Sequence, residues 1–229
     1  MDRGIDTNLT SVFINCPFTA DFRPLHEAIV FTVLACCFRP RSALEAGDSG
    51  DIRLDKIVRL IKESEYSLHD LSAVGLDVDT GLPRFNMPFE LGIAVGLKKA
   101  TRSYSSHCLL VLEDEKYTYQ KCLSDIAGQD LQAHGRDCAR LIPIVRNWLR
   151  TESRRTDIPG GARISAEFSL FQSDLPRICA DADLDREALP FVDLLSMVQT
   201  WLHEIGSTST ARPTHPSSGE SRTSVRRTA

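Results

Sequence analysis

Short apolar runs alternate with longer helical patterns in the first half of the chain, and this alternation restricts the fold more than any other feature. Apolar runs of strand length occupy residues 11–16, 38–44, 66–72 and 107–112. Segments with the length and spacing of helices occupy residues 25–37, 52–61 and 87–97. Repeated strand–helix–strand units need right-handed crossovers, which make the strands parallel in one sheet. The sequence therefore predicts an α/β fold, a flavodoxin-like or Rossmann-like parallel sheet with helices on both faces, followed by C-terminal helices.

Polar residues and turns follow the predicted strands, and in a parallel sheet these positions meet at one edge. Ligands of such sheets bind outside the carboxyl ends of the strands. The predicted ends hold Asn15, Pro17 and Phe18 in the first strand region, Arg41 and Ser42 in the second, and His69 and Asp70 in the third. We therefore expect a binding site where these residues converge.

The segment 87–97 reads as a helix that starts after a proline-rich turn, with Asn86 as its expected cap. It is apolar on nearly every side, so we expect it to be buried all round, with Gly92 and Gly96 allowing a close approach. Glu90 is its ionisable residue, and a helix start should favour the charged form of this carboxylate. Glu90 is either the reactive or ribose-binding group of a site, or only a partner for the helix N-terminus.

Composition excludes several classes of function. The net charge of -4 gives no electrostatic reason to bind nucleic acid. No apolar run is long enough to span a membrane, and the N-terminus lacks a signal-peptide pattern. The 7 cysteines are scattered and form no CxxC pair, which favours reduced thiols and a cytoplasmic location. The histidines show no ligand spacing, so we expect no metal site.

The chain is expected to divide into unequal parts. Residues 1–10 are polar and predict a flexible N-terminus, and residues 11–152 predict the α/β domain. Residues 153–206 predict a helical element that either packs on this domain or serves oligomerisation. Residues 207–229 are rich in Ser, Thr, Pro and Arg without apolar periodicity, which is typical of a disordered tail. Helices are expected at 117–126, 134–150, 166–179 and 187–205, with breaks at 130–134 and 153–161.

The motifs at 12–18, 69–72 and 87–92, taken in this order, resemble a known superfamily. They are similar to those of the nucleoside 2-deoxyribosyltransferases and of related TIR-like domains (the Toll/interleukin-receptor fold). In the transferases, a first strand ends in a Pro-Phe-like turn, a third strand ends in Asp, and a helix of the pattern Phe-Glu-Leu-Gly-x-Ala carries the nucleophilic Glu. Here residues 89–94 match that helix, and the resemblance covers residues 11–125.

One departure from the transferase pattern concerns the residues before this helix. The transferases usually have Asp-Gly-Thr there, whereas this chain has residues 82–87, which differ. The departure bears on deoxynucleoside specificity more than on glycosidic chemistry.

The resemblance implies cleavage of an N-glycosidic bond in NAD, a deoxynucleoside or a deoxynucleotide, with no further cofactor. Glu90 would attack the anomeric carbon, or support it electrostatically, as carboxylates do in retaining glycosidases. Asp70, with His69 beside it, would assist departure of a purine or pyrimidine. The alternative for Asp70 is to cap the turn at Ser72.

The remaining candidates are assigned to substrate binding. Arg41 and Arg84 would hold a phosphate, unless they are only solvated. Asn15 would hold a ribose hydroxyl or simply end its strand, and Phe18 would stack on a base or pack in the core. The predicted substrate-binding set is Asn15, Pro17, Phe18, Arg41, Ser42, His69, Arg84 and Asn86.

The resemblance also implies a biological role, an effector of bacterial defence against phage. The partners would be the nucleotide or nucleoside substrate and either further copies of the chain or other subunits of a multi-gene defence system. Two alternatives remain at this point: a TIR-like module that senses a nucleotide without cleaving it, and a scaffold that assembles protomers through its helical second half.

Overall fold

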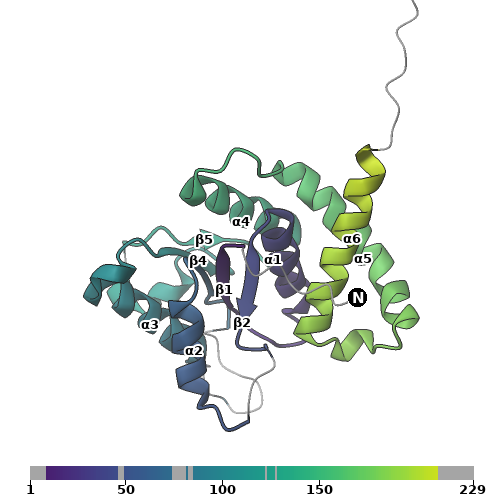
Figure 1. Cartoon of the computed structure of the whole chain (residues 1–229). Helices are drawn as coiled ribbons and strands as arrows, with labels where there is room; N and C mark the ends of the chain where they lie inside the picture. Colours follow the sequence, from purple (N-terminus) through teal and green to yellow (C-terminus); the bar gives the residue numbers. More distant parts are fainter. Residues whose placement is uncertain are drawn as a thin grey trace, which may run out of the picture.

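The computed structural model describes residues 9–45, 49–73, 81, 85–121, 123–126 and 128–210, and a parallel sheet forms its centre (Figure 1). The sheet has 5 strands in the order β2-β1-β3-β4-β5, and every neighbouring pair is parallel. The strands are β1 (Ser11–Asn15), β2 (Arg39–Ser42), β3 (Tyr66–Asp70), β4 (Cys108–Glu113) and β5 (Gln132–Ala133). This confirms the predicted α/β class, and the strand order is that of flavodoxin-like sheets.

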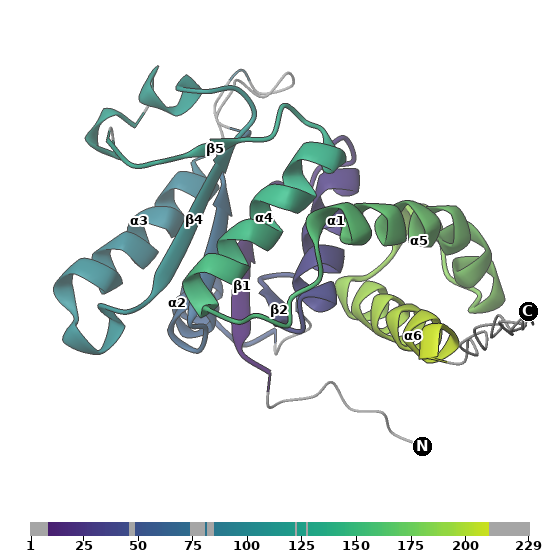
Figure 2. The same cartoon turned by 90° about the horizontal axis from the view of Figure 1, so that it is seen from above.

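Helices cover both faces of the sheet. One face is covered by α1 (Arg23–Ala35) and α4 (Cys138–Ser153), and the other by α2 (Arg53–Lys62) and α3 (Asn86–Ala100) (Figure 2). Beyond α1 lies an outer layer made by α5 (Gly161–Asp181) and α6 (Phe191–Thr210). Short 3-10 turns complete the described part: η1 (Arg102–Tyr104), η2 (Thr118–Lys121), η3 (Ser124–Ile126) and η4 (Arg186–Ala188). Within this part, no helix combines the length and hydropathy that a bilayer span requires.

Alternation along β1 assigns side chains to the two faces, because successive residues of a strand point in opposite directions. Val12 and Ile14 join the core under α1 and α4, whereas Phe13 packs with α2 and α3. β2 pairs only with β1 and so lies at a sheet edge, as Pro40 predicts, because proline has no amide hydrogen for a second ladder.

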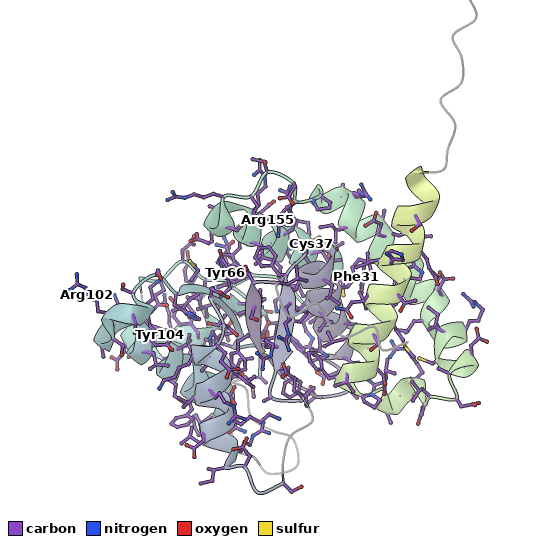
Figure 3. The ribbon with its side chains drawn as sticks, in the orientation of Figure 1. Phe31, Cys37, Tyr66, Arg102, Tyr104 and Arg155 are labelled. Carbon is purple, nitrogen blue, oxygen red and sulfur yellow. The ribbon has the colours of Figure 1, made fainter. Side chains whose placement is uncertain are left out.

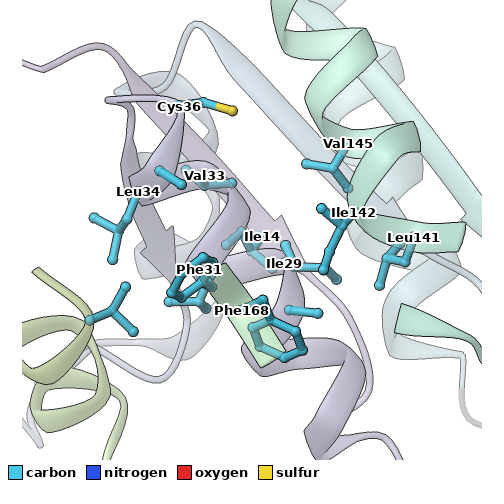
Figure 4. Close-up of a cluster of buried hydrophobic side chains, with 14 of the residues drawn as sticks. Ile14, Ile29, Phe31, Val33, Leu34, Cys36, Leu141, Ile142, Val145 and Phe168 are labelled. Carbon is cyan, nitrogen blue, oxygen red and sulfur yellow. The ribbon is translucent and has the colours of Figure 1, made fainter. Parts of the chain in front are cut away.

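The largest core forms around α1, which is buried on all sides from Leu25 to Ala35. Phe31 is central: its ring centroid lies 5.5 Å from that of Phe168, 5.4 Å from that of Phe171 and 5.9 Å from that of Trp201 (Figure 4). One continuous cluster thus includes residues of the sheet, α1, α4, α5 and α6. The C-terminal helices therefore pack on the α/β part through α1.

The side chain of Arg155, which follows α4, also contacts the end of α1. Arg155 Nη1 donates to the carbonyls of Cys36 and Cys37, at 3.1 and 3.2 Å (Figure 3). Its guanidinium carbon lies 5.2 Å from the ring centroid of Phe38. These contacts fix the segment between α4 and α5 against the start of β2.

The expectation that residues 87–97 are buried all round is wrong. Only Met87, Glu90, Leu91 and Ala94 of α3 are buried, and Phe89 is 58% exposed. A methyl group added at Gly92 or Gly96 would meet open space, so these glycines do not serve a close approach. The reason is that α3 is an outer helix that touches the protein along one stripe.

The expected cap of this helix is also wrong. Asn86 is exposed and is the first helical residue, while Phe85 occupies the N-cap position without a side-chain hydrogen bond. The backbone N–H of Phe89 donates to the Phe85 carbonyl at 2.9 Å, which starts the helix one residue earlier than Asn86 capping would allow.

Three further elements differ from the predictions. The helix expected at 117–126 is replaced by η2 and η3. The Glu113 carboxylate accepts hydrogen bonds from the backbone N–H groups of Tyr117 (2.8 Å) and Tyr119 (3.3 Å), which stabilises a turn there instead. The break expected at 130–134 contains β5. At the C-terminus, α6 continues to Thr210 rather than ending near residue 205, and the tail beyond 210 lies outside the described residues.

Candidate active site

The candidate site lies at the carboxyl ends of β1 and β3, where neighbouring strands are followed by helices on opposite faces. Asn15 ends β1, Asp70 ends β3, and Glu90 lies in the first turns of α3. Burial raises the pKa of the Cys16 thiol, and the charges of Asp70 and Glu90 raise it further. Because both charges act on this thiol, Cys16 lies near both carboxylates. Of the residues predicted to converge, Asn15, Asp70 and Glu90 thus lie around the end of β1.

Glu90 is 5% exposed, and within the described part of the chain no donor bonds to its carboxylate. Burial raises its pKa from 4.5 to about 7, and the charge of Arg53, at the start of α2, opposes this shift. The expectation that the charged form of this carboxylate is favoured is thus wrong, because desolvation outweighs the charge of Arg53. The carboxyl group is poised between its protonated and ionised forms near neutral pH.

Asp70 is fully buried and both of its oxygens accept hydrogen bonds. Oδ1 accepts the backbone N–H of Ser72 at 2.9 Å, so the alternative of a turn cap is confirmed. Oδ2 lies 3.0 Å from His134 Nε2. His134 Nδ1 accepts the backbone N–H of Arg136 at 2.9 Å, so the ring proton is on Nε2 and is donated to Asp70.

His134 was not found from the sequence. It follows β5, and its ring is fully buried and stands edge-on to Phe22, with 6.2 Å between ring centroids. A single histidine without a spaced partner carries no motif, and its role depends on β5 lying beside β4, which places it against the end of β3.

A chain of hydrogen bonds runs through the sheet from Asn15. Asn15 Nδ2 lies 3.0 Å from the carbonyl oxygen of Met87 and 3.0 Å from His69 Nδ1. His69 Nε2 lies 2.9 Å from Ser67 Oγ, which lies 2.8 Å from His107 Nε2. His107 Nδ1 lies 2.9 Å from the Ser64 carbonyl oxygen. We refer to these groups, from Asn15 to Ser64, as the Asn15 chain.

The histidines of the Asn15 chain are neutral. Burial, and then the nearby His107, lower the pKa of His69 to about 3. Burial also lowers the pKa of His107, although its bond to the Ser64 carbonyl opposes the shift. Both ring nitrogens of His69 are engaged inside the protein, so His69 reaches the site only through Asn15.

Phe18 lies on the α1 side of the turn that follows β1. Phe18 is 40% exposed and stands edge-on to His26, with 5.7 Å between ring centroids, whereas Pro17 is buried. Phe18 and His26 line a cavity of about 280 Å³ that Arg23, Leu44 and Phe191 also line. The structure thus places Phe18 toward the C-terminal helices.

The predicted residues of the second strand are engaged locally. Arg41 Nε donates to Glu45 at 2.8 Å, and its Nη1 lies 3.4 Å from Glu63. Ser42 is buried and its Oγ accepts the backbone N–H of Leu44 at 3.2 Å. The structure therefore brings neither residue to Glu90. Arg84 lies outside the described residues.

The site thus combines Glu90, Asp70, Asn15 and the main chain of α3, with Arg53 as the cation that acts on Glu90. The other sequence-predicted residues lie beside it (Pro17, Phe18), at a neighbouring strand (Arg41, Ser42), behind Asn15 (His69) or exposed at the start of α3 (Asn86). Neither the models of known protein families nor the curated proteins give a match to this sequence.

Proposed function

We propose that this protein is an N-glycosidase that acts on a nucleotide or nucleoside, with Glu90 as the carboxylate at the anomeric carbon. The observation that carries the proposal is a buried glutamate with a pKa of about 7 and no hydrogen-bond partner among the described residues, placed with Asp70 and Asn15 at the strand ends where α/β folds bind ligands. The similarity of the helix motif to that of the deoxyribosyltransferases supports the same assignment.

Glu90 would act in its ionised form. One carboxylate oxygen bonds to the anomeric carbon while the N-glycosidic bond breaks, and the bonding electron pair leaves with the base. Water then attacks the anomeric carbon of the resulting ester, loses a proton to solvent and releases the free carboxylate. Two displacements of this kind retain the configuration at the sugar.

Two observations favour NAD as the substrate. The nicotinamide ring of NAD is positively charged, so its binding would lower the pKa of Glu90 and ionise the attacking group. The same ring departs as a neutral molecule and needs no proton donor. Both oxygens of Asp70 already accept hydrogen bonds, from the Ser72 amide and from His134, so neither is free to contact a purine or pyrimidine.

Product analysis tests this proposal. Wild type, Glu90→Gln and the control Glu115→Gln, which changes an exposed glutamate, are incubated separately with NAD and with deoxynucleosides, and released bases are measured by mass spectrometry. Nicotinamide released by wild type and the control, but reduced at least about 1,000-fold in Glu90→Gln, is the expected result. Equal release by all three proteins would reject Glu90, and release only from deoxynucleosides would move the assignment to the transferase chemistry.

The alternative is a TIR-like module that binds a nucleotide without cleaving it or assembles with other copies. A cavity of about 680 Å³ between α5 and α6, lined by Trp201 and Met197 and by acidic residues, is the feature that favours assembly. Ligand recovered intact, or assembly lost on changing this groove, would support this alternative. Under either reading we propose a role in bacterial antiviral defence, to be tested by phage plating with wild type and Glu90→Gln.

A further inference from the structure

The Asn15 chain ends at both sides in a group that can only accept a hydrogen bond. These groups are the carbonyl oxygens of Met87 and Ser64. The chain between them has links from Met87 to Asn15, Asn15 to His69, His69 to Ser67, Ser67 to His107 and His107 to Ser64. Each link needs one proton, and the supply of protons is fixed by the chemistry of the side chains.

The protons available match these links in only one arrangement. The Asn15 amide supplies a proton to Met87 and another to His69, and neutral His69, Ser67 and neutral His107 supply one each to the next group. In the reverse direction, His69 would point an N–H at the Asn15 amide, and His107 Nδ1 would face the Ser64 carbonyl without a proton. Donor would then meet donor at one end and acceptor would meet acceptor at the other, so the direction of the chain is locked.

The locked direction fixes the orientation of the Asn15 carboxamide. Its nitrogen is held by Met87 and His69, and a rotated amide would place its oxygen against the Met87 carbonyl. The amide oxygen is then the remaining polar atom of a side chain that is 3% exposed. No hydrogen bond from the described ranges reaches this oxygen, and an amide oxygen has two lone pairs with which to accept one from a ligand.

The Asn15 side chain lies against the start of α3, the helix that carries the carboxylate of the proposed reaction. Met87 and Glu90 are three residues apart in α3 and are both buried, so they lie on the same face of the helix. Asn15 bonds to the first of them from the end of β1. The Asn15 carboxamide and the proposed nucleophile are therefore both placed at the first turns of α3.

We propose that Asn15 Oδ1 accepts a hydrogen bond from a hydroxyl of the substrate's sugar ring, and that Ser67, His69 and His107 act as positioning residues that hold the carboxamide in this orientation. The inference rests on the proposed function and adds a substrate requirement to it. A sugar that lacks this hydroxyl leaves the oxygen unpaired and should be rejected, as other sites built for a hydroxyl reject analogues without it.

The direction of the chain is tested without any substrate. Nitrogen-15 NMR of the histidine rings reports which nitrogen carries the proton. We expect the proton on Nε2 in His69 and on Nδ1 in His107 throughout the neutral pH range. The opposite tautomer in either ring would overturn the inference, whatever the protein is found to cleave.

The substrate requirement is tested with NAD and with its analogues that lack the 2′- or the 3′-hydroxyl of the nicotinamide ribose. Wild type should prefer NAD over one of these analogues by roughly 100-fold in kcat/KM or in affinity by calorimetry. In Ser67→Ala, which frees His69 and Asn15 to turn, the preference should fall to within about 5-fold, whereas Ser67→Thr keeps the hydroxyl and should retain it.

A loss of stability alone would lower turnover or affinity equally for NAD and its analogue. The ratio of the values for NAD and the analogue therefore distinguishes a positioning role of Ser67 from an effect on folding. An unchanged ratio in Ser67→Ala, or wild-type binding that does not distinguish NAD from either analogue, overturns the inference. If wild type binds the hydroxylated ligand selectively but cleaves nothing, the inference stands and the proposed glycosidase fails.

Discussion

The two faces of the sheet are used in different ways. Under α1 and α4 the sheet buries apolar side chains, and Phe31 joins this face to the outer helices through a cluster of aromatic rings. Under α2 and α3 the same strands carry the Asn15 chain, and Glu90 lies beside its end. We call these the apolar face and the polar face. The comparison teaches that the apolar face carries the larger hydrophobic core, whereas the polar face combines smaller apolar clusters with desolvated groups such as His69 and Glu90.

The largest expected effect is a loss of stability when the core of the apolar face is disrupted. Phe31→Ala removes a fully buried ring that contacts α5 and α6, and should lower the free energy of unfolding by about 4 kcal/mol. Urea unfolding followed by tryptophan fluorescence measures it. Leu170→Ala, at a position 60% exposed on α5, is the matched control and should change stability by less than about 0.5 kcal/mol. Similar losses in the two variants would contradict the central role of Phe31.

The next effect concerns the buried pair at the strand ends. His134→Ala removes the donor to Asp70 Oδ2 and leaves a buried carboxylate with one hydrogen bond fewer, which should cost about 3 kcal/mol at pH 7. His134→Gln retains an N–H donor and should recover part of the loss. If His134→Gln and His134→Ala unfold at the same urea concentration, the pair contributes little beyond packing.

The third effect concerns the desolvated carboxylate of Glu90 on the polar face. The pKa of Glu90 is about 7 in the folded protein and 4.5 in the unfolded chain, so the folded state binds the proton more tightly. Stability therefore falls as pH rises from about 4.5 to 7 and is lowest above 7. The stability of Glu90→Gln relative to wild type should therefore be greater at pH 8 than at pH 4.5 by about 3 kcal/mol. A pH-independent difference, like that expected for Glu115→Gln, would contradict the pKa of Glu90.

The smallest effect concerns the exposed side of α3. Gly96→Ala places a methyl group in open space and reduces the freedom of the unfolded chain, so it should stabilise the protein by about 0.5–1 kcal/mol. Thermal unfolding by circular dichroism measures it. A lower melting temperature would indicate that another molecule or chain approaches this side of the helix.

The parallel sheet could be predicted because its strands are continuous apolar runs between helical segments. The short strand β5 could not, since two residues carry no periodic pattern and their pairing is decided by β4. The burial of α3 was misjudged for a related reason: an apolar side chain such as Phe89 is exposed when its helix lies at the periphery, and sequence does not state which helix does.

The same distinction applies to the candidate site. Asn15, Asp70 and Glu90 could be brought together from the sequence because parallel strands end at one edge. Their partners could not, since His134, Ser67 and His107 become neighbours only through the register of β3 with β4 and β5. The pKa of Glu90 also depends on burial, which competes with the helix start and cannot be weighed from spacing.

The position of α1 between the sheet and the outer helices has a consequence for biosynthesis. The ring of Phe31 leaves the ribosome well before residues 161–210 of α5 and α6 are translated. At 5–20 residues per second the delay is on the order of ten seconds. Throughout that interval the outer side of α1 is an uncovered apolar surface on a nascent chain, which is a binding site for chaperones and a site of aggregation without them. We therefore expect slower translation through α4 and α5 to lengthen the time for which this surface is exposed.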